Sequence, residues 1–143
     1  MNKQLVCLGH QMTLHNPSGN FDMIEGLTPP NVPGPPPHYH AGYSELFYVL
    51  EGKMEFMLDG KTVLVQPGES IDVPANTLHT FKNAGDGPCR WMNIHSPKGF
   101  LSFFEKFGVD AMREDAFAQS VDGQIIQAVL QEAADYDMHI KLP

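Results

Sequence analysis

The sequence predicts an all-β domain followed by a helical extension. Its 143 residues include 13 glycines and 12 prolines, and this abundance of turn residues favours a β-rich fold over a helical one. From residue 45 onward, short apolar runs alternate with glycine-containing turns at intervals of about eight residues, which is typical of an antiparallel sandwich or barrel. The length fits one domain with one core, so we expect residues 1–143 to form a single domain.

The strands are predicted from these apolar runs. Residues 4–28 mix short apolar pieces with turn residues, which indicates short strands joined by tight turns. The proline-rich residues 28–37 exclude helix and central strand alike, and form a stiff, extended approach to His38. Further strands are expected in ELFYVLEG, KMEFMLDG, KTVLVQPG, ESIDVP, LHTFKN and CRWMNIHS, all within residues 45–96.

Two helices are expected after these strands. Ser96 at an N-cap and Pro97 at the first helical position predict that one helix begins there. The second follows Asp122, where an apolar stripe at helical spacing would pack against the barrel or against a partner subunit. The stripe contains Ile125, Ile126, Val129, Leu130 and Ala133.

Charge and composition exclude several functions. Nine Lys and Arg against 17 Asp and Glu give a formal net charge of -8, and without a basic run the chain is not expected to bind nucleic acid. No apolar stretch is long enough for a signal peptide or a membrane-spanning helix, so we expect a cytoplasmic protein that does not bind membranes. Cys7 and Cys89 are far apart and indicate neither a disulfide framework nor a thiolate zinc site.

Four residues are candidates for a metal site. His38 and His40 lie two apart on an extended segment and therefore share a face. Glu45, if it opens the next strand, faces the same interior as Phe47 and Val49, and His79 begins a later short strand. Three imidazoles and a carboxylate suit one divalent transition metal (Fe, Mn, Ni, Cu, Co or Zn) and leave coordination positions open for a small molecule. The alternative is that these are four unrelated polar residues at strand ends. It is disfavoured because imidazole and carboxylate side chains occur at spacings that place them on the same face.

These residues carry a resemblance to a known family. The run His38-x-His40-x4-Glu45-x6-Gly52 resembles the first cupin motif, and Gly68-x5-Pro74-x-Asn76-x2-His79-x3-Asn83 resembles the second. The resemblance implies a small single-domain cupin: a double-stranded β-helix, or jelly-roll barrel, over about residues 20–100, with the helical extension over about 97–135. Gly34 is nearer to the first histidine than the family's leading glycine, and Asn76 replaces a glycine, but neither departure removes a position that corresponds to a metal ligand.

A looser resemblance concerns the activity. The segment PKGFLSFFEKFG looks like the helix that follows the barrel in small quercetinase-like cupins. This implies a dioxygenase that acts on a small enolic or aromatic substrate. Glu45 is either a metal ligand or a displaceable carboxylate that takes a proton from a coordinated hydroxyl, and the resemblance implies the second role. A metal-dependent isomerase or lyase, and a non-catalytic small-ligand-binding cupin, remain alternatives. Because cupins commonly pair, we also expect a homodimer.

The remaining polar residues are expected to have ordinary structural roles. His10, His15, His95 and His139 are by default surface or structural residues. Trp91, Asn93 and His95 share a strand face; if it points inward, Asn93 or His95 would orient a ligand, although packing or solvent exposure is favoured. Candidate phosphate-binding residues between 38 and 95 all lie in or beside turns or strand ends, which disfavours a phosphorylated substrate; they are Lys53, Lys61, Lys82 and Arg90.

Overall fold

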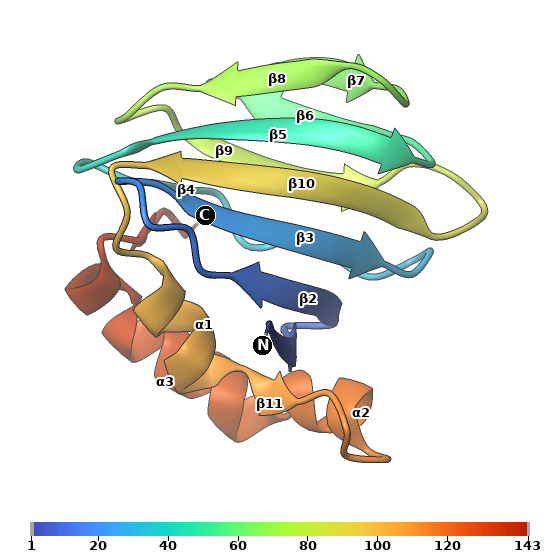
Figure 1. Cartoon of the computed structure of the whole chain (residues 1–143), viewed down its shortest axis with the longest axis vertical. Helices are drawn as coiled ribbons and strands as arrows, with labels where there is room; N and C mark the ends of the chain where they lie inside the picture. Colours follow the sequence, from blue (N-terminus) through green and yellow to red (C-terminus); the bar gives the residue numbers. More distant parts are fainter. Residues whose placement is uncertain (1, 143) are drawn as a thin grey trace.

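The protein consists mainly of two antiparallel β-sheets, with helices gathered on one side (Figure 1). The structure, a computed structural model, describes residues 2–142. The first sheet has the strand order β11-β1-β2-β3-β10-β5-β8 and the second has the order β12-β4-β9-β6-β7. Neighbours in each order are not consecutive in sequence at several points, because the chain passes back and forth between the sheets.

The first sheet has seven strands. They are β1 (Lys3–Cys7), β2 (His10–His15), β3 (Asp22–Thr28), β5 (Ser44–Glu51), β8 (Ser70–Val73), β10 (Cys89–Ser96) and β11 (Val109–Asp110). The second sheet has five strands: β4 (His38–Tyr39), β6 (Met54–Leu58), β7 (Lys61–Val65), β9 (His79–Asn83) and β12 (His139–Ile140). The sheet structure therefore begins at β1. The short strand β11 lies within the predicted helical extension, and β12 lies just after it.

Strand alternation determines which side chains face the interior. Along β5, Glu45, Phe47 and Val49 are buried while Leu46 and Tyr48 are exposed, which confirms the predicted inward direction of Glu45. Along β10, the face that carries Trp91, Asn93 and His95 is the buried one. The face with Asn93 and His95 therefore points inward, which the sequence left open.

The core lies between the two sheets and is rich in aromatic side chains. The ring of Phe47 on β5 lies 4.9 Å from Phe56 and 5.5 Å from Phe81, both on the opposite sheet. Trp91 completes this cluster, 5.8 Å from Phe47 and 5.6 Å from Phe81. Burial of these large apolar rings is the main source of stability that holds the sheets together.

Strand register brings the polar residues into line. On β10, His95 lies opposite Glu45 of β5 on one side and opposite Asp22 of β3 on the other. In the second sheet, His38 of β4 lies opposite His79 of β9. Three cross-strand pairings thus assemble most of the polar interior, because directly opposite residues have their side chains close together on the same face.

The first helix begins later than the sequence predicts. The expectation that Ser96 caps a helix starting at Pro97 is wrong, because Ser96 ends β10 and α1 spans Leu101–Phe107. The backbone N–H groups of Gly99 and Phe100 both donate to Asp22 Oδ2 at 3.0 Å. These bonds hold the residues after Pro97 in a non-helical link across the end of β3, so the helix forms only beyond them.

The other helices are α2 (Ala116–Ser120), α3 (Gly123–Glu132) and the 3-10 helix η1 (Ala133–Tyr136). Helix α3 follows Asp122 as predicted, and the Asp122 side chain accepts a hydrogen bond from the N–H of Gln124. The predicted stripe is divided: Val129 and Ala133 are buried, whereas Ile126 and Leu130 remain 41% and 45% exposed. No helix within residues 2–142 combines the length and the apolar character needed to cross a bilayer.

Candidate metal centre

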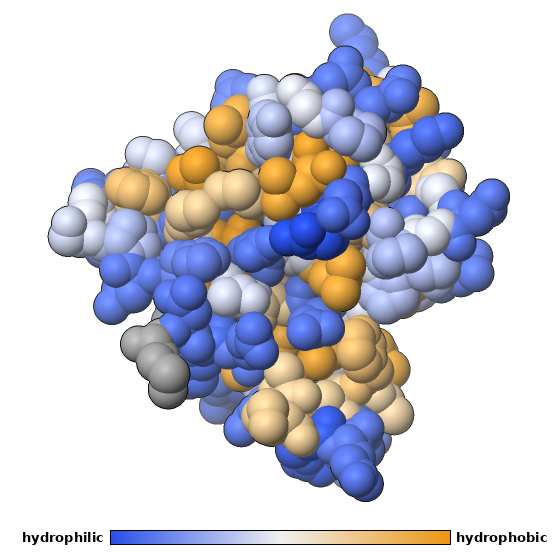
Figure 2. All heavy atoms as spheres, turned by 45° about the vertical axis from the view of Figure 1, so that its right-hand side comes forward, coloured by the Kyte–Doolittle hydropathy of each residue, from blue (hydrophilic) through white to orange (hydrophobic). Residues whose placement is uncertain are grey.

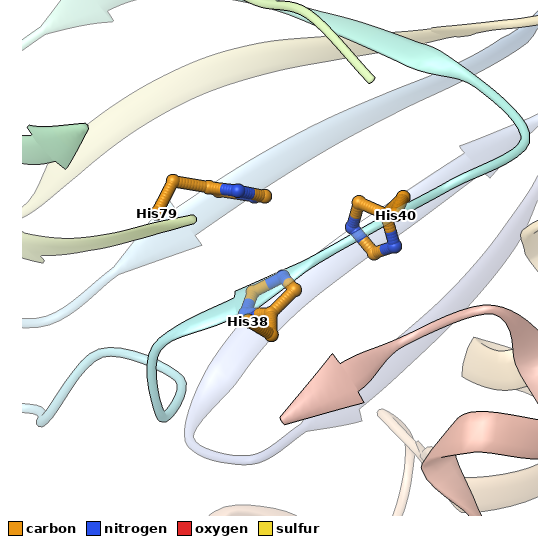
Figure 3. Close-up of side chains that lie close together, drawn as sticks. All are labelled: His38, His40 and His79. Atoms are coloured by element: carbon orange, nitrogen blue, oxygen red, sulfur yellow. The ribbon is translucent and has the colours of Figure 1, made fainter. Parts of the chain in front are cut away.

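Three buried histidines converge at one end of the interior. Figure 3 shows the rings of His38, His40 and His79 turned toward a common point. One nitrogen atom from each ring lies within 4.8 Å of the others, and the rings of His38 and His79 are 4.3 Å apart. His38 lies on β4, His40 directly follows this strand, and His79 begins β9. The same-face pairing predicted for the His-x-His segment is therefore present.

Each ring is anchored in the same way. The Nδ1 atoms of His38, His40 and His79 lie 2.8 Å from the backbone carbonyl oxygens of Pro36, Asp137 and Thr77, respectively. A carbonyl oxygen can only accept, so each Nδ1 carries a hydrogen and donates it. In the neutral rings the Nε2 lone pairs are then free. This tautomer, fixed by a carbonyl acceptor, is the one that Nε2-coordinating histidines adopt at metal sites.

Glu45 lies directly beside this cluster. Its Oε2 atom is 2.9 Å from Nε2 of His79 and 3.3 Å from Nε2 of His40, yet within the described chain Oε2 has no partner in hydrogen-bond geometry. Adjacent ligands of one ion with bonds of about 2.1 Å stand about 3 Å apart in an octahedral arrangement. The spacing and the donor set of three imidazoles with one carboxylate therefore fit a divalent transition ion.

The charges within the site are coupled. Burial by itself would raise the pKa of Glu45, but contacts with His40, His79 and His95 outweigh it and hold that pKa well below its ordinary value. Burial, reinforced by the neighbouring histidines, lowers the pKa of His38 to about 3. Burial also opposes protonation of His79, but the Glu45 carboxylate outweighs it and raises the pKa of His79. Near neutral pH the site thus contains an ionised carboxylate and a neutral His38.

A second row of polar residues supports Glu45 from behind. Oε1 of Glu45 lies 3.1 Å from Nε2 of His95, and Nδ1 of His95 lies 3.3 Å from Oδ2 of Asp22. Burial disfavours a charged His95, but the two carboxylates outweigh it and raise its pKa. His95 is therefore buried inside the site and is not a surface residue. The alternation in WMNIHS is the sequence pattern that indicated His95. No sequence pattern indicated Asp22.

The C-terminal segment completes the surroundings of His40. Besides the Asp137 carbonyl that binds His40, the Asp137 carboxylate accepts hydrogen bonds from the N–H groups of Ala41 and Gly42, at 3.0 and 2.7 Å. The Tyr43 hydroxyl lies 2.7 Å from Nδ1 of His40, and β12 pairs with β4 immediately after Asp137. Residues almost a hundred positions apart thus hold one ligand candidate, which no local motif indicates.

The histidines and Glu45 face a cavity with largely aromatic walls. In its present form the cavity has a volume of about 60 Å³. Phe47, Phe81 and Trp91 of the sheets line it together with Phe100, Phe104 and Met138 of the C-terminal part. No lysine or arginine of the described residues lines it. The cavity therefore suits a small organic molecule better than a phosphorylated one.

Comparisons with known proteins agree with this architecture. The Cupin domain family model matches residues 27–95. Quercetin 2,3-dioxygenase of Bacillus subtilis (strain 168) is 29% identical over 106 residues, which cover 74% of this chain but only 31% of that protein. The chain thus matches about a third of the length of this relative.

Solved structures share the fold. KdgF from Halomonas sp. superposes with a TM-score of 0.58 at 21% identity, over 63% of this chain and 80% of that one. A sugar phosphate isomerase of the cupin superfamily from Silicibacter pomeroyi gives the same TM-score of 0.58, at 21% identity, over 64% of this chain and 61% of that one. Residues 27–95 thus match the Cupin domain family, and the shared fold of the solved structures confirms the predicted cupin β-barrel.

Proposed function

We propose that this protein is a metal-dependent cupin dioxygenase for a small enolic or aromatic substrate, with His38, His40, Glu45 and His79 as metal ligands. The main support for this proposal is that three Nε2 atoms converge beside an ionised carboxylate that faces an apolar cavity, while the Nδ1 atom of each ring is bound to a backbone carbonyl. A divalent transition ion held there would polarise a substrate oxygen and, if redox-active, support reaction with dioxygen.

Glu45 has a second role in this proposal, as the general base. Its Oε2 atom borders the cluster, 2.9 Å from Nε2 of His79, and as a displaceable ligand it would leave the ion to take the proton of a substrate hydroxyl. The other oxygen, Oε1, lies 3.1 Å from Nε2 of His95. This contact places Oε2 on the side of His40 and His79.

The aromatic wall serves the same reaction. Phe100 lies 5.0 Å from the His40 ring, and Phe104 lies 5.2 Å from Phe100. These side chains give the space in front of the histidines an apolar wall. A deprotonated, electron-rich substrate would there be shielded from premature protonation. The quercetin 2,3-dioxygenase relative supports a reaction of this class.

A metal-dependent isomerase or lyase is the second candidate. It is favoured by the row Asp22, His95 and Glu45, whose contacts of 3.3 and 3.1 Å form a buried sequence of proton-carrying groups. Such a row can take and return protons at a carbon next to a polarised carbonyl without consuming oxygen. A cupin that binds a small ligand without turnover has the same residues and differs only in its kinetics.

The test begins with the metal content of the purified protein, followed by loading with iron, manganese, nickel, copper, cobalt or zinc in turn. Each form is mixed with catecholic and enolic compounds in an oxygen electrode, while substrate loss is followed by chromatography. Oxygen uptake that matches substrate loss supports the dioxygenase. Product without oxygen uptake supports the isomerase or lyase, and binding without turnover supports the ligand-binding module. Failure to bind any of these metals would refute all metal-dependent versions.

The homodimer also remains a prediction. Figure 2 shows apolar areas between the hydrophilic ones on the surface, and β5 and β7 carry exposed apolar side chains. These are Leu46, Tyr48, Val63 and Leu64, each at least 38% exposed. Light scattering coupled to size-exclusion chromatography measures the oligomeric state directly. The cytoplasmic location, and the absence of nucleic-acid and membrane partners, likewise remain predictions.

A further inference from the structure

His10 is a buried polar residue of the cavity that the metal centre does not use. It begins β2, is only 3% exposed, and lines the same cavity as the three-histidine cluster. Its ring lies 5.6 Å from Phe81, which follows His79 by two residues along β9. Residues two apart on a strand are separated by roughly 6.6 Å. His10 and the three histidines therefore line one cavity, with the Phe81 ring next to His10.

The hydrogen bonds around His10 favour one tautomer. Oγ1 of Thr28 lies 2.9 Å from Nε1 of Trp91 and 2.9 Å from Nδ1 of His10. The indole N–H can only donate, so the Thr28 hydroxyl accepts from Trp91. When this hydroxyl directs its own hydrogen at Nδ1 of His10, the neutral ring carries its hydrogen on Nε2. This tautomer supplies an N–H donor at Nε2.

This Nε2–H group has no partner of its own. Within the described residues no hydrogen bond reaches Nε2 of His10; the Pro33 carbonyl favours a proton on the ring but does not meet hydrogen-bond geometry. Burial lowers the pKa of His10 to about 4, so the ring is neutral at physiological pH. An unpaired donor in an apolar cavity is unfavourable, and a ligand acceptor would relieve this.

We propose that His10 is a substrate-binding residue whose Nε2–H donates to a second oxygen of the substrate, across the ring from the oxygen that approaches the three histidines. This inference rests on the proposed function and specifies its substrate class. The substrate would be a one-ring or similarly compact molecule with two oxygen functions on opposite sides. A neutral donor favours a carbonyl or hydroxyl oxygen over a multiply charged anion.

The size of the cavity limits the substrate further. A space of about 60 Å³ is smaller than an aromatic ring requires, so lining side chains must move when the ligand enters. Met12 and Met138 line the cavity, and unbranched methionine side chains rearrange readily. A compact substrate is therefore expected to bind with less rearrangement than a molecule with several rings.

The test compares two probes of nearly equal size. The zinc-loaded and the metal-free protein are titrated calorimetrically with 3,4-dihydroxybenzaldehyde, which carries a carbonyl oxygen opposite its hydroxyl pair, and with 4-ethylcatechol, which lacks it. Zinc is used because it does not oxidise catechols. One well-formed hydrogen bond corresponds to about a tenfold preference for the aldehyde. His10→Leu should abolish this preference at unchanged zinc content, and His10→Gln, which retains an N–H donor, should restore part of it.

A second measurement does not depend on a variant. Histidine nitrogen NMR of the labelled wild-type protein should show His10 as the Nε2–H tautomer, with its Nε2 resonance shifted by the aldehyde and not by the ethyl compound. Wild-type protein without the preference, a preference that survives in His10→Leu, or an Nδ1–H tautomer would each overturn the proposal. Failure of the proposed function is a different result: it would appear as absence of turnover in the oxygen-electrode test.

Discussion

Nε2 of His95 lies 3.1 Å from Oε1 of Glu45, at the point where β10 and β5 place the two residues directly opposite each other. Because Oε1 is held there, Oε2 of the same carboxylate faces His40 and His79. The orientation of the proposed ligand and base is thus determined by a neighbour that is not itself a ligand candidate. In metal sites such supporting partners commonly account for a factor of 10–100 in metal affinity.

His95→Leu is therefore expected to weaken zinc binding by about 10–100-fold, because Glu45 loses its orienting contact. His95→Gln retains an N–H donor and should recover part of the loss. Competition with a chelator of known affinity measures both variants. A Leu variant that binds zinc as tightly as the wild type would show that His95 only fills space.

Glu45→Gln removes the negative charge but preserves the shape. We expect zinc affinity to fall on the order of 100-fold and turnover to be lost, since the variant lacks both an anionic ligand and a base. Glu114→Gln, at an exposed position, is the matched control and should change neither. Metal analysis after dialysis reports the first effect, and wild-type metal content in the Gln variant would contradict the assignment.

The stability of the metal-free protein should be greatest near pH 6.5, the usual histidine pKa of the unfolded chain. The pKa values of His79 and His95 are raised in the folded state, so their stabilisation is complete below about pH 6.5 and is lost as the pH rises through the folded values. His38 and His10 are shifted down, to about 3 and about 4. Folding keeps these two rings neutral, so the stability of the protein is unaffected by them above about pH 6.5 and falls as the pH drops from there toward those values.

Urea unfolding between about pH 4 and pH 9 measures this profile. Zinc affinity should change in the opposite direction above pH 6.5, growing with pH because His79 must release its proton before it can coordinate a metal. A stability that stays constant from pH 6.5 to 9 would indicate that His79 and His95 are not protonated in the folded protein.

Gly34 is predicted to be irreplaceable by alanine. An added Cβ atom would overlap the carbonyl oxygen of Phe81 in the neighbouring β9 segment, and a backbone atom cannot yield as a flexible side chain can. Gly34→Ala should lower the free energy of unfolding by about 3 kcal/mol. Gly123→Ala is the control, since its Cβ meets no atom within 4 Å, and it should be neutral or stabilising by up to about 1 kcal/mol. Equal unfolding midpoints in urea would refute the close approach.

The class of fold and the four ligand candidates could be predicted from local sequence patterns. Regularly spaced glycine turns and apolar runs predict an all-β barrel because local backbone geometry and strand alternation are encoded in neighbouring residues. His38 and His40 share a face for the same reason. The inward direction of Glu45 and the start of α3 after Asp122 were also predicted correctly from local patterns.

The contacts that support these residues come from distant parts of the chain and could not be predicted from local patterns. The start of α1 was predicted incorrectly because Asp22, far away in sequence, binds the N–H groups of Gly99 and Phe100. The partners of His95 and His40, Asp22 and Asp137, likewise come from distant strands and from the C-terminal segment. Strand register and side-chain packing between remote segments place these groups, and no local periodicity encodes such contacts.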